Sequence, residues 1–87
     1  MRTIKKYELV RGENKISTPN LSEVVCATDE GGKIWVWMEV ETENVERVMR
    51  AFFVMGCEDE VGEGMSIAFI GWGHTPSGEV VIIYEIL

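Results

Sequence analysis

The sequence contains few of the residues that small proteins use to supplement a minimal core. Its 87 residues include only two cysteines, Cys26 and Cys57, and one histidine, His74. These three side chains are fewer than the four Cys or His ligands of a structural zinc site. We therefore expect no metal and no cofactor.

Long apolar runs are missing as well. No stretch approaches the roughly 20 apolar residues that cross a bilayer, so we expect no membrane contact. Residues 1–7 read Met-Arg-Thr-Ile-Lys-Lys-Tyr and lack the long apolar core of a secretory leader. This pattern predicts a cytoplasmic protein in which both thiols stay reduced.

Basic residues are scarce, since 8 Lys and Arg oppose 15 Asp and Glu, which gives a formal charge of −7. A chain with this net field repels a phosphate backbone, so we expect no direct binding to nucleic acid. The acids concentrate in residues 39–46 and 58–63. They are either ordinary solvated charges or a protein-binding face. That acidic face would comprise Glu39, Glu41, Glu43 and Glu46.

Alternating apolar residues predict a mainly β fold. The clearest pattern lies at residues 34–41, where Ile34, Val36, Met38 and Val40 share one face and Trp35, Trp37, Glu39 and Glu41 the other. The preceding residues 24–28 would pair with this strand across a Gly-Gly turn. Residues 11–15 read as a turn, and residues 16–20 as an extended segment broken by Pro19.

One region fits two secondary structures. Apolar residues in residues 44–53 fall at helical spacing, which would give one short helix. The same stretch also alternates, with Val48, Arg50, Phe52 and Val54 on one face and Arg47 on the other. The whole chain, residues 1–87, then forms a single domain of about six antiparallel strands in a meander or small sandwich.

The last residues, 80–87, form a strand that is apolar on both faces. Such a strand needs cover on both sides, because a half-exposed strand alternates apolar with polar residues. It would form a hairpin with residues 66–72, which are also apolar on both faces. A single core of this size supplies only roughly 3 to 5 kcal/mol of net stability. We therefore expect a homo-oligomer assembled through the C-terminal strands and the tryptophan face.

Several side chains suit ligand binding without chemistry. Indole rings offer flat surfaces for an interface or for stacking a planar ligand, and arginine forks match phosphates or carboxylates. The candidate ligand-binding residues are Trp35, Trp37, Arg47, Arg50, Trp72 and His74. No catalytic motif accompanies the lone histidine, so we expect no enzyme.

The order of short motifs along the chain resembles a known family. These motifs are Arg-Thr-Ile-Lys-Lys-Tyr-Glu at residues 2–8, then Trp37, Arg-Ala-Phe at residues 50–52, and Phe-Ile-Gly at residues 69–71. They are similar to those of small uncharacterised proteins of tailed bacteriophages, a domain of unknown function, that begin Arg-Thr-Ile-x-Lys-Tyr-Glu. The resemblance implies a phage setting, hence the host cytoplasm, and favours a strand over a helix at residues 47–55.

Three binding or assembly functions follow as hypotheses. In the first, an oligomeric phage accessory protein sequesters a small anionic or nucleotide-like host molecule at its tryptophans and arginines. In the second, the acidic face inhibits a host nucleic-acid-binding defence protein. In the third, the protein assembles with itself as a virion accessory component.

Overall fold

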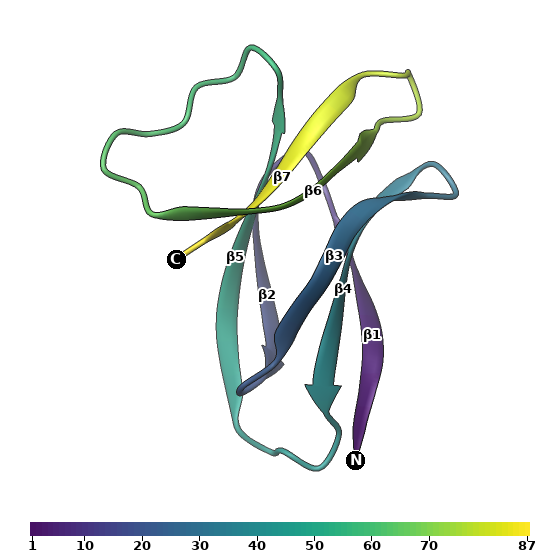
Figure 1. The fold of residues 1–87 in the computed structure, drawn as a ribbon, viewed down its shortest axis with the longest axis vertical. Coiled ribbons are helices and arrows are strands. Elements are labelled where there is room, and N and C mark those ends of the chain that lie inside the picture. Colours follow the sequence, from purple (N-terminus) through teal and green to yellow (C-terminus); the bar gives the residue numbers. More distant parts are fainter.

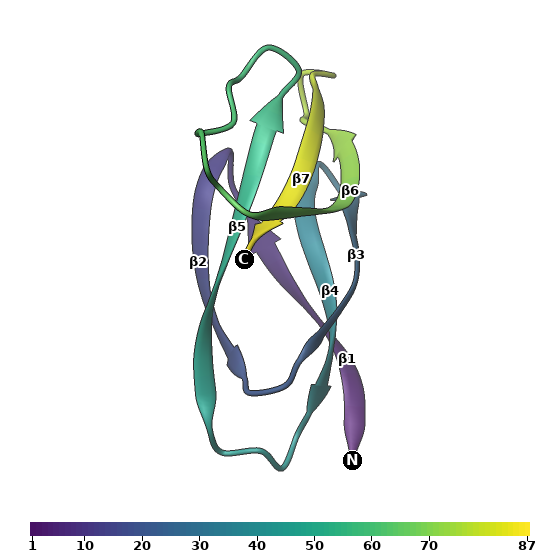
Figure 2. The ribbon, with the colours of Figure 1, turned by 60° about the vertical axis from the view of Figure 1, so that its left-hand side comes forward.

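The computed structural model describes residues 1–87 as seven β-strands without a helix. The strands are β1 (Arg2–Leu9), β2 (Gly12–Pro19), β3 (Glu23–Glu30), β4 (Lys33–Glu41), β5 (Arg47–Gly56), β6 (Ile67–His74) and β7 (Val80–Ile86). They form one sheet in the order β1-β4-β3-β6-β7-β5-β2. The sheet curves into a flattened, nearly closed barrel with extents of 40 × 33 × 15 Å (Figures 1 and 2).

The main-β prediction is confirmed, but the prediction of about six strands missed β2. Residues 11–15 were expected to form a turn, whereas β2 pairs with β5 from Gly12 to Pro19. Its polar residues Glu13, Lys15 and Ser17 are exposed, while Thr18 is buried. β2 is an edge strand, where a proline is tolerated because one side of its backbone needs no partner. Pairing with β5 therefore overrides the weak local signal.

The helix alternative at residues 44–53 is wrong. β5 lies between β2 and β7, and its backbone pairs with both neighbours. Along β5, Phe52 and Val54 are fully buried, whereas Arg47 and Met49 are exposed. This burial confirms the alternation that the sequence offered as the second interpretation.

The meander is also wrong, because only two pairs of consecutive strands are neighbours in the sheet. These are the β3–β4 and β6–β7 hairpins, both expected from the sequence. The hairpins meet in a parallel contact between β3 and β6, at Ala27 and Gly71, so the sheet is not wholly antiparallel. A Cβ atom on Gly71 would lie 1.8 Å from the carbonyl oxygen of Ala27. Glycine is therefore required where the two hairpins meet.

The predicted alternation of β4 is confirmed and supplies much of the core. Ile34, Val36, Met38 and Val40 are buried, while the intervening tryptophans and glutamates are half-buried on the outer face. The other members of the core cluster come from the surrounding strands: Leu9, Ala27, Phe52, Val54, Val81 and Ile83.

The C-terminal strand β7 is an inner strand of the sheet and obtains part of its cover from its own chain. Val81 and Ile83 point into the core, whereas Ile82 and Tyr84 are half-buried on the outside. Part of that outer cover comes from residues 57–66, which place Val61 and Met65 around the same small cavity as Tyr84. The cover that we assigned to further copies is thus partly intramolecular, and the homo-oligomer stays a prediction. No helix that could span a membrane is present.

Candidate functional site

The structure distributes the candidate ligand-binding residues over separate surfaces. Trp35 lies on the outer face of β4 and is occupied by its own neighbours. The Lys6 ammonium lies 4.3 Å from the centroid of the indole and 2.9 Å from Glu30 Oε1. The indole N–H of Trp35 donates a hydrogen bond of 3.0 Å to the carbonyl oxygen of Glu30. These contacts fix Trp35 between β1 and the β3–β4 turn.

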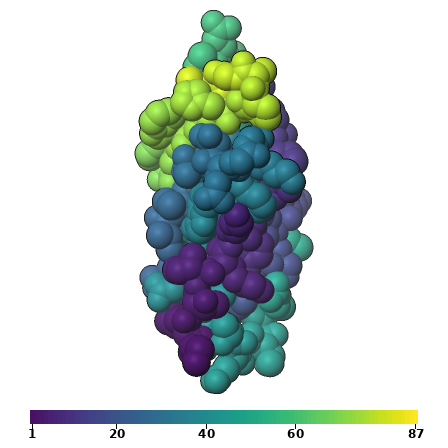
Figure 3. Space-filling model, turned by 90° about the vertical axis from the view of Figure 1, so that its right-hand side faces the viewer, coloured from purple at the N-terminus to yellow at the C-terminus, as the bar shows by residue number.

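Trp37, two residues further along the same face, borders an open groove of about 290 Å³ across β1, β4 and β3. A β-bulge at Val25 turns both Val25 and Cys26 outward, and both are exposed. Ile4 contributes the opposite wall from β1 and is 52% exposed. The groove is lined by Ile4, Val25, Cys26, Thr28, Asp29, Glu30 and Trp37. Figure 3 shows β1 lying against the residues of the β3–β4 hairpin.

Trp72 and His74 lie together on β6 and do not line the groove. Their rings meet edge to face with centroids 5.5 Å apart, and Trp72 is 53% exposed. The backbone N–H of His74 donates to Asp29 Oδ1 at 2.9 Å, and the His74 Nδ1 atom lies 3.9 Å from the same oxygen. The neighbouring hydroxyls of Thr75 and Ser77 bond each other. No hydrogen bond joins His74 to a hydroxyl group, so the expected absence of a catalytic pair stays a prediction.

The two candidate arginines lie on opposite faces of β5. Arg47 is exposed and donates to Ser17, with Nη2 2.8 Å from the Ser17 carbonyl oxygen. Arg50 points inward and forms a two-point pair with Glu85, in which Nη2 lies 2.9 Å from Oε1. A third donor, Nη1, reaches the Ser22 carbonyl oxygen at 2.6 Å. The hydrogen bonds to Glu85 raise the pKa of Arg50, and each of the three guanidinium nitrogens of Arg50 donates a hydrogen bond within the chain.

Sequence reasoning missed Glu85 as the partner of Arg50. Glu85 alternates with the buried residues Val81 and Ile83, and Arg50 alternates with the buried Phe52. Two charged residues at inward positions of different strands are the signal that predicts such a pair, because an ionised group is rarely buried alone. The pairing of β5 with β7 then brings them together.

The acidic face predicted from the sequence divides into paired and unpaired carboxylates. Glu39 lies 2.9 Å from Arg2, and Glu41 contacts the N-terminal ammonium. The N-terminal ammonium, followed by the backbone N–H of Glu43, lowers the pKa of Glu41. Glu43 and Glu46 have no cationic partner, and their loop is attached to the β2–β3 turn by a bond from the Asn20 amide to the Glu46 carbonyl.

The unpaired negative charges gather at two ends of the barrel. Of the 15 side-chain carboxylates, eight lie within 4.0 Å of a Lys, Arg or N-terminal nitrogen, which leaves seven. One is Asp29 beside His74. The β4–β5 end carries Glu23, Glu43 and Glu46, and the loop of residues 57–66 carries Glu58, Glu60 and Glu63. Figure 1 shows these two ends at opposite extremes of the long axis.

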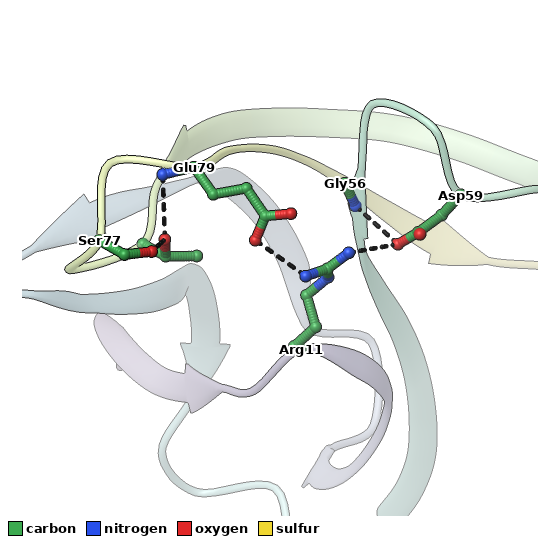
Figure 4. A network of polar contacts seen from close by, with 6 residues as sticks. Arg11, Gly56, Asp59, Ser77 and Glu79 are labelled. Carbon is green, nitrogen blue, oxygen red and sulfur yellow. Dashed lines mark hydrogen bonds and ion pairs between the residues drawn. The ribbon is translucent and has the colours of Figure 1, made fainter.

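A third charged cluster fastens the loop of residues 57–66 to the rest of the barrel (Figure 4). Arg11 lies 2.7 Å from Asp59 and 2.8 Å from Glu79, so it joins three connections between strands. Asp59 also accepts the backbone N–H of Gly56 at 2.8 Å. The bond from Arg11, and then that from Gly56, lowers the pKa of Asp59, and the carboxylate of Asp59 raises the pKa of Arg11.

Comparison with known proteins places the chain in a family. A family profile described as a domain of unknown function (DUF7352) matches residues 1–85. No curated protein and no solved structure matches the chain.

Proposed function

This chain belongs to the DUF7352 family, a domain family of unknown function, and we propose that it is a non-enzymatic inhibitor that captures a basic partner protein. The capturing surface is the β4–β5 end, whose residues are Glu23, Glu39, Glu41, Glu43 and Glu46. The resemblance of the chain to tailed-phage proteins implies a phage setting. The basic partner of this chain is then a host nucleic-acid-binding defence protein in the host cytoplasm.

The observation that carries this proposal is the distribution of charge. Of the eight basic side chains, only Lys5 and Arg47 lack a carboxylate within 4.0 Å. At the β4–β5 end, Glu23, Glu43 and Glu46 have no cation within 4.0 Å, and Arg47 at the start of β5 is the free cation of that end, so the end keeps an excess of negative charge. Such a surface attracts a basic groove over the Debye length, about 10 Å at 0.1 M salt, and repels nucleic acid.

The β4–β5 end also offers apolar contacts among its carboxylates. Val45 is 91% exposed, and Leu21 in the adjoining β2–β3 turn is 75% exposed. The side-chain amide of Asn44 donates to the Asn20 carbonyl at 2.9 Å, so the two loops are held side by side. Exposed apolar side chains rimmed by charge are typical of protein contact surfaces.

Charge reversal at the two ends of the barrel tests the proposal with matched variants. One variant carries Glu23→Lys, Glu43→Lys and Glu46→Lys, and the control carries Glu58→Lys, Glu60→Lys and Glu63→Lys, so both change the net charge equally. The measurement is inhibition of DNA binding by the host proteins that a heparin column retains. The first variant should inhibit about tenfold less well than the control, because only it alters the capturing surface. Equal inhibition by both variants would contradict the proposal.

Sequestration of a nucleotide-like anion is the second candidate function. The observation that favours it is Arg47, which is exposed and has no carboxylate partner. Arg47 lies on β5, however, whereas Trp37 and Trp72 lie on β4 and β6. Arg50 is paired with Glu85, so an anion site that combines arginine and indole needs the Arg47 of another copy. Native mass spectrometry of the protein purified from its host should then show an oligomer with a bound small molecule. A bare monomer would contradict this function.

A further inference from the structure

The groove beside Trp37 fits a ligand that the function proposed above does not use. We propose that this groove binds a small organic cation, an ammonium group carried on a flat or branched apolar body. The site lies on the outer face of β1, β4 and β3 and is independent of the carboxylates Glu43 and Glu46 at the β4–β5 end.

The walls of the groove are apolar where an exposed strand face is usually polar. Ile4 and Val25 are 52% and 55% exposed, and Trp37 lies half-buried between their strands. The bulge at Val25 builds one wall, because it directs two consecutive residues outward where a regular strand would direct one. The volume of about 290 Å³ is close to the lower end of the range for small-molecule sites, roughly 300 to 1,000 Å³.

The charge around the groove selects a cation. Asp29 and Glu30 line one end of the groove. Beyond the other end, Glu39 lies opposite both Ile4 and Glu23 in the strand register. The nearest cations are already engaged, since Lys6 bonds Glu30 and Arg2 bonds Glu39. Asp29 and Glu23 have no Lys or Arg partner, so they would repel an anion, whereas an ammonium group would find the free Asp29 oxygen as an acceptor.

Several polar atoms of the lining have no hydrogen-bond partner, among them the two that the ligand would use. Only Oδ1 of Asp29 is bonded, to the His74 N–H, and its Oδ2 atom has no partner. The indole N–H of Trp37 likewise has no hydrogen bond within the chain, in contrast to that of Trp35. An ammonium group can donate to the free Asp29 oxygen while its apolar body covers the Trp37 ring.

The neighbouring contact of Lys6 shows the same recognition within the chain. Its ammonium lies over the Trp35 ring and beside Glu30, which combines a cation, an indole and a carboxylate. A cation over an indole face contributes about 0.5 to 1 kcal/mol at an exposed site and more where water is excluded. The groove offers an unoccupied indole, that of Trp37, and the carboxylate Asp29 is among the other residues that line it.

The two cysteines provide the test, because Cys26 lines the groove and Cys57 is exposed outside it. The rate at which iodoacetamide modifies each thiol is measured with three probes of similar shape: phenethylammonium, 2-phenylethanol and phenylacetate. Phenethylammonium near saturation should slow modification of Cys26 about fivefold and leave Cys57 unchanged, because bound ligand covers the thiol. The neutral and anionic probes should protect weakly or not at all. Equal protection by the three probes, or none by phenethylammonium, would overturn the proposal.

Variants separate the groove from a general surface effect. Asp29→Asn should reduce the protection by phenethylammonium to that given by 2-phenylethanol, and Ile4→Ser on the exposed edge strand should weaken protection by both probes. Trp72→Ala removes an exposed indole outside the groove and should leave protection as in the wild type. Full protection in Asp29→Asn, with circular dichroism showing a folded protein, would exclude the charge recognition. A variant with Glu43→Lys and Glu46→Lys alters no carboxylate named beside the groove and should keep the protection of Cys26, so each proposal fails or stands separately.

Discussion

Two guanidinium–carboxylate clusters in this chain have the same chemistry in different surroundings. Arg50 and Glu85 meet inside the barrel, with side-chain exposures of 21% and 11%. Arg11 meets Asp59 and Glu79 at the surface, with exposures of 47%, 43% and 40%. Arg50 makes three hydrogen bonds and Arg11 two, so the clusters differ more in their burial than in the number of their bonds.

The difference lies in what happens when a partner is lost. A group that loses its partner at the surface is solvated at once, whereas inside the barrel its charge stays without an acceptor. Loss of one partner of the inner cluster should therefore destabilise the barrel, whereas loss of one partner of the outer cluster should change only how the loop of residues 57–66 is held. The substitutions below test this distinction, beginning with the largest expected effect.

Glu85→Gln should destabilise the fold by about 3 kcal/mol, because it leaves the Arg50 guanidinium largely buried without a counter-charge. The free energy of unfolding from guanidinium chloride titration measures this loss. The inward position of Glu85 between β5 and β6 prevents water from replacing the carboxylate fully.

A double variant distinguishes the unpaired charge from simple loss of packing. Arg50→Met combined with Glu85→Leu removes both charges and keeps apolar volume in the barrel. Its free energy of unfolding should lie within about 1 kcal/mol of the wild type, since a buried ion pair contributes little relative to apolar replacements. A double variant as unstable as Glu85→Gln would contradict the assigned role of the charge.

Arg11→Met should loosen the attachment of the loop of residues 57–66 and leave the free energy of unfolding of the whole protein almost unaltered. The Gly56 amide, which donates to Asp59, should exchange its hydrogen faster because Asp59 loses the contact that orients it. Added salt should narrow the difference, since exposed ion pairs are screened. Lys15→Met is the matched control, because it removes the same charge from a pair with Glu13 at the longer distance of 4.0 Å.

Acid should loosen the attachment of the same loop of residues 57–66, and this effect should be the smallest of those predicted. The pKa of Asp59 lies below its ordinary value of 3.8 in the folded protein, mainly because of Arg11. Stabilisation from such a group is complete above the unfolded-state pKa and is lost as the pH falls through the folded-state value. Protection of the Gly56 amide should therefore persist at pH 5 and decline below about pH 4. Asp59→Asn should abolish that decline, and an unchanged decline would assign it to another group.

The candidate site was predictable only in part. Alternation placed Trp35 and Trp37 on the outer face of β4 and separated Arg47 from Arg50. It did not reveal that Arg50 bonds Glu85, that Lys6 covers Trp35, or that a bulge at Val25 opens a groove beside Trp37. Each of these depends on strand register, which a sequence pattern of period two does not specify.

The β class, the inner and outer faces of β4, the two Gly-containing hairpin turns and the excess of acid could all be derived from the amino-acid pattern. These features are local, because side-chain alternation and turn chemistry act over a few residues. Long-range packing made residues 12–19 a strand, made residues 47–56 a strand instead of a helix, joined the hairpins at Ala27 and Gly71, and left particular carboxylates unpaired. These outcomes depend on contacts between segments distant in sequence, because closing the barrel selects one set of strand partners.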